Sequence, residues 1–426
     1  MHSTFPSNFM DFSNPYFTII LLGVLGLFAL DTAAKLLNLK ALRPQLPKDF
    51  ADVYKEDEYG RSQEYTRETS RFDIIQSTFS LIVFLAFWLL GGFAWLDELV
   101  RSWTDNALLQ GISYVCVLFL ASLVISLPWD YFDTFVIEEN YGFNKSTKGT
   151  FFGDQAKSLA IGAALGLPLL ALVFYLFERF ELAWLWGWIA VSGFSLTMAY
   201  LAPRFIMPLF NKFTPLEDGE LKSAINEMAK NCDFPVCELS VMDGSKRSSK
   251  SNAFFTGFGK NKRIALFDTL IEKHSVAELV AVLAHEIGHF KKKHIVQSMV
   301  IGIAQTGVLF FLIHLFLKNE QLFAAFGVKQ TSIYLSFILF SLLFKPVSKI
   351  LSVLMAIFSR KNEFEADAYA ADVTGDANSL ITALKKLSKD NLANLTPHPF
   401  YVFMHYSHPP LTERVGALKK LASAAH

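Results

Sequence analysis

Apolar residues in this chain come in long runs, not in the alternating or one-sided patterns of water-soluble strands and helices. Seven runs approach or exceed the roughly 20 residues that a helix needs to cross a bilayer. They cover about Phe17 to Ala34, Ile74 to Leu96, Leu108 to Leu127, Ser158 to Phe177, Leu182 to Leu201, Met299 to Leu317 and Ile333 to Phe358. Lys345 and Lys349 interrupt the last run. The pattern predicts a mainly α, polytopic membrane protein with about seven transmembrane helices.

The segment between the fifth and sixth runs has the mixed polar and apolar texture of a soluble domain. Leu216 to Lys230 is typical of a helix, and Glu238 to Met242 of a short strand. Ala253 to Gly257 and Arg263 to Phe267 flank a GKNK turn, which predicts a hairpin. We therefore expect a small domain of helices and a β-sheet here.

This pattern divides the chain into four parts. We expect spans one to five with their loops in residues 1-202, and a soluble segment with an edge strand and the HEIGH helix in residues 203-297. Spans six and seven occupy residues 298-358, and a C-terminal segment occupies residues 359-426.

Composition agrees with a membrane protein. Hydrophobic residues make up 52% of the 426 residues, charged residues 18%, and mean hydropathy is +0.33. A soluble enzyme of this size would carry more charge. The 39 Lys and Arg residues balance the 39 Asp and Glu residues, so no basic field points to nucleic acid as a partner.

The distribution of basic residues predicts the orientation in the membrane. The loop after the first run carries several, namely Lys40, Arg43, Lys48, Lys55, Arg61, Arg67 and Arg71, whereas the preceding tail has none. The positive-inside rule therefore places the N-terminus outside and this loop in the cytoplasm. Alternation then places 129–157, 203–297 and the C-terminal segment inside. The outer loops, Asp97 to Asn106 and Glu178 to Glu181, are short.

The three cysteines are Cys116, Cys232 and Cys237. An odd number argues against a disulfide framework, and the x4 spacing of the last two is a weak metal-binding pattern. We interpret them as ordinary thiols in a reducing compartment.

One helix carries the pattern His-Glu-x-x-His. Ser275 and Glu278 form a capping box that opens VAELVAVLAHEIGHF. His285 and His289 are four residues apart, so both imidazoles lie on one helix face, as a single zinc ion requires. Glu286 lies beside them and is placed to act as a base on an attacking water.

A third protein ligand is not found next to this motif. His294 is nine residues past His285, which on a continuing helix turns it to the opposite face. The longer zincin pattern also fails, because residues 292 and 295 are Lys and Ile. We interpret Lys291, Lys292, Lys293 and His294 as basic residues at the cytoplasmic mouth of the sixth span.

A better third ligand lies in SRKNEFEADAYA, after the seventh span. Glu363 and Asp367 are four residues apart on one predicted helix face. Glu363 can supply a carboxylate oxygen to zinc, and Asp367 can accept the free N–H of a ligand histidine. Spans six and seven leave and return to the same side of the membrane, which brings Glu363 back to the side of His285 and His289.

A peptidase also needs a donor for the oxyanion of its tetrahedral intermediate. The segment FYVFMHYSHPPLTERVGAL offers four candidates, Tyr401, His405, Tyr406 and His408, and the residues themselves do not choose among them.

Six stretches in this order resemble the type I CAAX prenyl protease family of membrane gluzincins. They are FVIEENYGFNKST (135–147), PLFNKFTPLEDGELK (208–222), SNAFFTGFG (251–259), HEIGH (285–289), SRKNEFEADAYA (359–370) and SHPPLTER (407–414). The resemblance covers most of the chain. It implies seven helices around a chamber in the membrane, with one zinc ion (Zn2+) at the cytoplasmic-side wall.

The resemblance also assigns roles to residues. It implies His285, His289 and Glu363 as zinc ligands, Glu286 as the catalytic base and Asp367 as the supporting acid.

Four further assignments rest on the resemblance. It implies that His408 contacts the transition state, that Arg414 supports it, and that Asn252 and Ala253 belong to an edge strand that pairs with substrate backbone. The implied reaction removes the last three residues of a prenylated Cys-a-a-X protein or peptide.

Two features bear on location and substrate. The chain ends in SAAH, without a retrieval signal for the endoplasmic reticulum, and its outer loops are short. We therefore expect a bacterial inner membrane protein, or an endoplasmic reticulum membrane protein in a eukaryote, with the active site toward the cytoplasm. Many bacteria lack prenylation, so a quality-control protease acting on unprenylated membrane proteins is the alternative.

A second alternative is a non-enzymatic transporter. Charged residues inside the predicted spans, Asp31, Lys35, Lys345 and Lys349, are its support. All four could lie near cytoplasmic helix ends and extend toward water, which weakens this reading.

Overall fold

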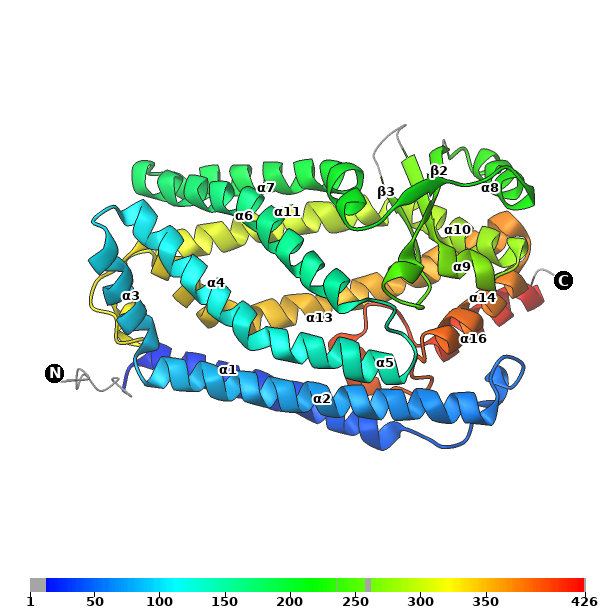
Figure 1. Ribbon diagram of the computed structural model, residues 1–426, viewed down its shortest axis with the longest axis horizontal. Helices are drawn as coiled ribbons and strands as arrows, with labels where there is room; N and C mark the ends of the chain where they lie inside the picture. The colour runs from blue at the N-terminus through cyan, green and yellow to red at the C-terminus, as the bar shows by residue number, and fades with distance from the viewer. Residues whose placement is uncertain (1–12, 235, 257–261, 425–426) are drawn as a thin grey trace.

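Seven long apolar helices run through most of the length of the molecule (Figure 1). The computed structural model describes residues 13–234, 236–256 and 262–424, and within them these seven are long and apolar enough to cross a membrane. They are α1 (Pro15–Ala41), α2 (Glu56–Leu89), α4 (Ala107–Phe132), α6 (Lys148–Arg179), α7 (Ala183–Leu201), α11 (His294–Phe316) and α13 (Ile333–Thr374). The predicted seven spans are confirmed.

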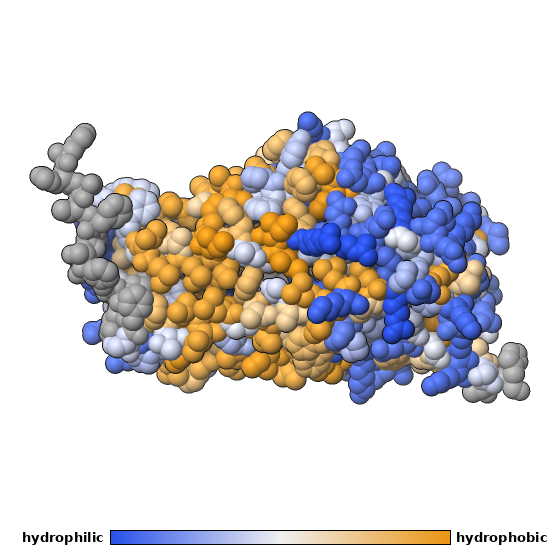
Figure 2. All heavy atoms as spheres, turned by 90° about the horizontal axis from the view of Figure 1, so that it is seen from below, coloured by the Kyte–Doolittle hydropathy of each residue, from blue (hydrophilic) through white to orange (hydrophobic). Residues whose placement is uncertain are grey.

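The surface over these helices is strongly apolar. Figure 2 shows hydrophobic residues covering the middle of the molecule and hydrophilic residues gathered at one end. Large side chains such as Leu22, Ile75 and Val124 are 60–69% exposed. A water-soluble protein does not expose apolar surface on this scale, so this band is the part that faces lipid.

The second span ends earlier than predicted. Helix α2 stops at Leu89, and Gly91 has φ 78°, a left-handed conformation that glycine adopts without strain. The chain then forms α3 (Gly92–Trp103), which buries Phe93 and Leu96 against the membrane helices. Most of the predicted outer loop is therefore an amphipathic helix that covers this end of the bundle (Figure 1).

Helix α13 continues through the end of the predicted seventh span. It includes both the apolar run and the acidic SRKNEFEADAYA stretch, so the proposed division between residues 358 and 359 falls inside one helix. Lys349 pairs with Asp31 of α1 at 3.0 Å, and Lys345 lies 5.7 Å from the ring centroid of Phe84. These contacts accommodate the two lysines within the bundle.

Shorter elements complete the membrane part. Helix α4 continues through a π-helical turn (Asp133–Ile137) into α5 (Glu138–Asn140), and α7 continues through Ala202–Ile206 and Met207–Leu209. The remaining pieces are the 3-10 turns Lys48–Phe50 and Gly244–Lys246, and helix α12 (Glu320–Ala324).

The hydrophilic end contains a four-stranded sheet in the order β1-β2-β4-β3. Its strands are β1 (Phe213–Pro215), β2 (Val236–Met242), β3 (Ala253–Thr256) and β4 (Lys262–Phe267). β2 and β4 are parallel, and the other two pairings are antiparallel. The predicted hairpin is confirmed as β3 and β4, although Gly257 and the GKNK turn lie outside the described residues. β3 forms an edge of the sheet among the described residues.

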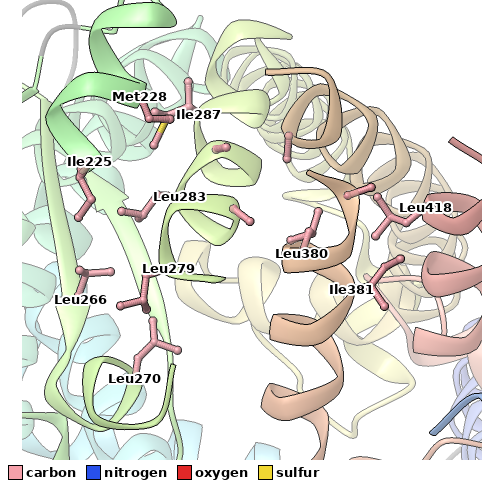
Figure 3. Close-up of a cluster of buried hydrophobic side chains, with 14 of the residues drawn as sticks. Ile225, Met228, Leu266, Leu270, Leu279, Leu283, Ile287, Leu380, Ile381 and Leu418 are labelled. Carbon is pink, nitrogen blue, oxygen red and sulfur yellow. The ribbon is translucent and has the colours of Figure 1, made fainter. Parts of the chain in front are cut away.

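Helix α10 (Val276–Lys291) lies at the centre of the hydrophilic end. Around it lie α8 (Glu220–Asn231), α9 (Asp268–Lys273), α14 (Ala377–Asp390), α15 (Pro399–His405) and α16 (Leu411–Ala424). Figure 3 shows Leu279, Leu283 and Ile287 of α10 facing the sheet and α8, with α14 and α16 on the other side. All three are at most 1% exposed, and burying each stabilises the fold by about 1.5–3 kcal/mol. The helix that carries His-Glu-x-x-His is thus held on two sides.

Cys116 and Cys232 are free thiols, and the side chain of Cys237 lies outside the described residues.

Candidate metal centre

The start of α10 is fixed by its capping box and by an ion pair. The Oγ of Ser275 accepts the amide of Glu278 at 3.3 Å, and Oε2 of Glu278 accepts the amide of Ser275 at 3.2 Å. Lys386 of α14 donates to both oxygens of Glu278 at 2.7 and 2.9 Å. These contacts confirm the predicted cap and fix the helix that presents His285, Glu286 and His289.

Gly288 allows α10 to approach α13 closely. A Cβ at this position would lie 3.1 Å from both the Cα and the carbonyl oxygen of Ala366, closer than ordinary van der Waals contact. Ala366 lies between Glu363 and Asp367 in sequence. The close approach therefore brings two carboxylates of α13 against the two histidines of α10.

His285, His289 and Glu363 converge on one point. Nε2 of His285 lies 3.2 Å from Nε2 of His289, which lies 3.2 Å from Oε1 of Glu363. Nε2 of His285 lies 3.5 Å from Oε2 of Glu363. His285 and Glu363 are buried and His289 is half-buried. Three potential ligand atoms within 4.8 Å of one another could hold one metal ion.

Asp367 and Arg414 support this group from behind. Oδ1 of Asp367 lies 2.8 Å from Nδ1 of His285, on the side of the ring away from Glu363. Arg414 donates two hydrogen bonds to Asp367, at 2.6 and 2.8 Å, and its Nη1 lies 3.2 Å from Oε2 of Glu363. A bidentate guanidinium is the strongest partner that a buried carboxylate finds in a protein. Arg414 thus orients Glu363 and Asp367.

The electrostatics of the site favour a cation. Burial alone would lower the pKa of His285, but the carboxylates of Asp367 and Glu363 outweigh it and raise the pKa to about 9. Burial likewise opposes the charge of Arg414, but the same two carboxylates hold the pKa of Arg414 above its ordinary value. A site that draws a proton onto a buried histidine is equally suited to a metal ion.

Glu286 and His408 are the two residues predicted to act on the substrate beside the group. Glu286 is half-buried on α10, next to His285. Nε2 of His408 lies 3.4 Å from Oε1 of Glu363, Nδ1 lies 3.0 Å from Oγ of Ser407, and the side chain is 64% exposed. The ring of His408 is therefore accessible to a bound substrate.

The structure separates the four candidate oxyanion donors. His405 lies 3.7 Å from Asp31 of α1, and its ring packs 4.7 Å from that of Tyr401. Tyr406 packs against Tyr401, and its carbonyl accepts a hydrogen bond from Arg360. Of the four, His408 is the one that contacts Glu363.

His294 lies at the start of the sixth span, as predicted, but it does not face away from the metal group. Helix α10 ends at Lys291, and Lys293 adopts a left-handed conformation with φ 61° before α11 begins at His294. This turn brings His294 back against α10, where it is 4% exposed and its Nδ1 lies 3.0 Å from Nδ1 of His289. The prediction of a basic residue on the opposite face was wrong, because the helix does not continue.

Ala253 begins the edge strand β3, and Asn252 directly precedes it. The carbonyl of Asn252 accepts a hydrogen bond from Phe267 of β4 at 3.1 Å, and its side chain accepts the amide of Ala253 at 2.8 Å. Ala253 lies opposite Leu266. Asn252 is exposed, and β3 stands last in the strand order of the described sheet.

Two family descriptions match the chain. The N-terminal region of CAAX prenyl proteases, described as five membrane helices, matches residues 35–212. Peptidase family M48 matches residues 215–422, which contain all the residues of the metal group.

Relatives and a solved structure match over almost the whole length. CAAX prenyl protease 1 of Saccharomyces cerevisiae is 36% identical over 407 residues, with 89% of each chain covered. The CAAX prenyl protease 1 homologue of Mus musculus is 34% identical over 422 residues, with 88% of this chain and 89% of the relative covered. The crystal structure of S. mikatae Ste24p superposes with a TM-score of 0.90 at 34% identity, covering 95% of this chain and 99% of that one.

Proposed function

The chain belongs to peptidase family M48 and its CAAX prenyl protease branch, and from this premise we propose that it is a zinc endopeptidase that removes the C-terminal tripeptide of prenylated Cys-a-a-X proteins. The chain is a multi-pass membrane metallopeptidase. The ion, the residue roles and the substrate are parts of the proposal.

The spacing of His285, His289 and Glu363 carries the proposal. Zinc–nitrogen and zinc–oxygen bonds are about 2.0–2.1 Å long, so two ligand atoms of a tetrahedral site lie about 3.3 Å apart. Here the two Nε2 atoms lie 3.2 Å apart, and each lies near one oxygen of Glu363, at 3.2 Å from Oε1 for His289 and 3.5 Å from Oε2 for His285. Two histidines and one glutamate with an open fourth position form a donor set typical of catalytic zinc.

Glu286 is the residue we assign to proton transfer. When bound, zinc supplies Lewis-acid polarisation of the scissile carbonyl and makes water acidic enough to attack near neutral pH. Glu286 then accepts a proton from the attacking water and passes it to the leaving amine. Its place next to His285 on α10 supports this role, since a base must reach the proton that it removes.

His408 is the residue we assign to the oxyanion. Its position beside Glu363 and its exposed ring support a hydrogen bond to the negative charge that develops in the transition state. Arg414 keeps Glu363 and Asp367 ionised and in place, and Asp367 holds the ring of His285 with Nε2 toward the centre.

The edge of β3 is the part we assign to substrate binding. Asn252 and Phe267 form a hydrogen-bonded antiparallel pair, so the pairing alternates along the strand. The backbone N–H and C=O groups of Ala253 and Phe255 therefore point away from β4, and the N–H of Ala253 donates to the Asn252 side chain, which a substrate would have to displace. An extended peptide that pairs with these groups would present its scissile bond in a fixed register.

The proposed substrate follows from the relatives. The relatives are named CAAX prenyl proteases, and the chain covers 89% of both the yeast and the mouse protein. We propose a prenylated peptide that reaches the site from the membrane, a chamber between the spans, and an active site on the cytoplasmic side. The bacterial inner membrane, with the endoplasmic reticulum as the eukaryotic equivalent, stays a prediction.

A cleavage assay on the purified full chain in detergent tests the proposal. A farnesylated Cys-a-a-X peptide and its unprenylated twin are offered to the wild type and to Glu286→Gln, and the zinc content of each sample is measured. We expect one zinc per chain in both proteins, release of the tripeptide by the wild type, faster cleavage of the farnesylated peptide, and loss of cleavage in the variant.

Two results that differ from this expectation have separate meanings. Equal cleavage of many unprenylated membrane-protein segments would favour the quality-control alternative and refute the prenyl requirement. Folded protein with neither zinc nor Glu286-dependent cleavage would refute the peptidase mechanism itself.

A further inference from the structure

His294 occupies a buried position that the proposed mechanism does not use. The left-handed residue Lys293 reverses the chain between α10 and α11, so that His294 packs against His289. Its other ring nitrogen, Nε2, lies 3.2 Å from Oε2 of Glu365 on α13. His289, His294 and Glu365 thus form a continuous chain of contacts from the metal group to the surface of α13.

Hydrogen-bond chemistry fixes the direction of this chain. An ionised carboxylate only accepts, so Nε2 of His294 donates to Glu365. A neutral imidazole has one donor and one acceptor, so Nδ1 of His294 is then the acceptor. It accepts a hydrogen bond from Nδ1–H of His289 at a nitrogen–nitrogen distance of 3.0 Å. The lone pair of His289 is then on Nε2, the atom that faces Glu363.

The opposite arrangement is excluded by the same reasoning. If His294 donated from Nδ1, His289 would have to accept there and carry its proton on Nε2. That proton would occupy the position where a metal must bind. Nε2 of His294 would then be an acceptor facing the carboxylate of Glu365, which also only accepts.

Helix α13 therefore serves both histidines of α10. Asp367 contacts Nδ1 of His285 directly at 2.8 Å, and Glu365 contacts Nδ1 of His289 through the ring of His294. The two carboxylates differ in setting, because the side chain of Asp367 is 2% exposed and that of Glu365 is 40% exposed.

We propose that His294 and Glu365 are positioning residues that fix the tautomer and ring orientation of His289 for metal binding. This inference rests on the proposed function, because it takes His285, His289 and Glu363 as the metal ligands. Such outer contacts are worth about 10- to 100-fold in metal affinity in other zinc proteins.

The test measures zinc affinity on the full chain in detergent by competition with a chromophoric chelator. The variants are Glu365→Gln, His294→Phe and the double variant. Lys361→Gln is the matched control, because Lys361 is a 74% exposed neighbour of Glu365, 3.7 Å away, that does not contact either histidine. Thermal unfolding of the metal-free proteins reports on folding separately.

We expect both single variants to bind zinc about 10- to 100-fold more weakly and Lys361→Gln to bind like the wild type. Because the residues act in series, the double variant should be no weaker than His294→Phe. If either residue had only a structural role, its substitution would lower the stability of the metal-free protein, and the losses of zinc affinity in the two single variants would not be coupled in the double variant. Glu365→Gln alters a half-exposed side chain, so it remains informative if His294→Phe does not fold.

Two results would have distinct consequences. Wild-type affinity in Glu365→Gln, or additive losses in the double variant, would overturn the relay and leave the proposed function intact. A wild type that binds no zinc would instead refute the metal site on which both proposals depend.

Discussion

At the scale of single residues, function depends on which atom of each side chain faces the centre. Both histidines of α10 turn Nε2 toward Glu363 because a neighbour holds Nδ1, namely Asp367 for His285 and His294 for His289. Arg414 in turn holds Asp367 with two hydrogen bonds. The metal group is thus the inner part of a larger network of buried charges.

Substituting Asp367→Asn should weaken the site without removing a ligand. We expect zinc affinity to fall about 10- to 100-fold, because an amide fixes the His285 tautomer less strongly. The free energy of unfolding should also fall, because buried Arg414 loses its charged partner. Chelator competition and thermal unfolding measure the two effects. Glu413→Gln, at the exposed position beside Arg414, is the control and should change neither.

Substituting His408→Ala should separate catalysis from metal binding. We expect kcat to fall about 10²- to 10³-fold, the usual loss for one oxyanion donor, with zinc content unchanged. Ser407→Ala removes the partner at 3.0 Å from Nδ1 and should have a smaller effect. A rise in KM with kcat preserved would instead assign His408 to substrate binding.

At the scale of elements, the contact between α10 and α13 builds the site. Each helix carries part of the metal group, and Gly288 sets how closely they approach. The edge strand β3 lies in the same part of the molecule, on the sheet that packs against α10 (Figure 3). The positions of these three elements relative to one another decide whether ligands, base and substrate meet.

Gly288→Ala should push the two helices apart. The added methyl group would meet backbone atoms of Ala366 at 3.1 Å, and backbone cannot move aside as a side chain can. We expect a loss of about 1–3 kcal/mol in unfolding free energy together with weaker zinc binding. Gly416→Ala on α16 meets no atom within 4 Å and should instead stabilise by about 0.5–1 kcal/mol. Equal behaviour of the two variants would argue against a packing role for Gly288.

Backbone pairing with β3 predicts a period of two along the substrate. Peptides that carry a single N-methyl group should lose affinity at alternate residues, since every second N–H faces the strand. Each affected position should raise KM about 5- to 10-fold, the value of one hydrogen bond. A KM profile without alternation would contradict strand pairing.

At the scale of the whole molecule, the described residues form two large hydrophobic cores and one small cluster. One large core lies among the membrane helices around Trp88, Tyr114 and Phe326, and the other surrounds α10 at the hydrophilic end. Helix α13 belongs to both and carries Glu363 from the bundle into the metal group. The bundle therefore fixes the third candidate ligand relative to the first two.

The predicted orientation can be tested by cysteine labelling in sealed vesicles. With the three native cysteines replaced, single cysteines are introduced at the exposed positions Asp57, Asp218 and Ser102. A membrane-impermeant maleimide should reach Asp57→Cys and Asp218→Cys from one side and Ser102→Cys from the other. Labelling of Asp57→Cys and Asp218→Cys from opposite faces would overturn the topology.

The sequence by itself determined the elements and the local chemistry. Long apolar runs have few stable alternatives to membrane helices, because lipid leaves no partner for an unpaired backbone group. The capping box of α10 and the pair His285 and His289 were also predictable, since residues four apart on one helix must share a face.

Only the tertiary structure decided how the distant parts meet. The distances from Glu363 to the two histidines follow from the packing of α13 on α10, which no local pattern encodes. Likewise, the turn at Lys293 has neither the Gly nor the Asn that usually signals a left-handed residue, so His294 was assigned to the wrong side. Local interactions are determined by residues close in sequence, whereas the buried relay from His289 through His294 to Glu365 exists only because three helices pack together.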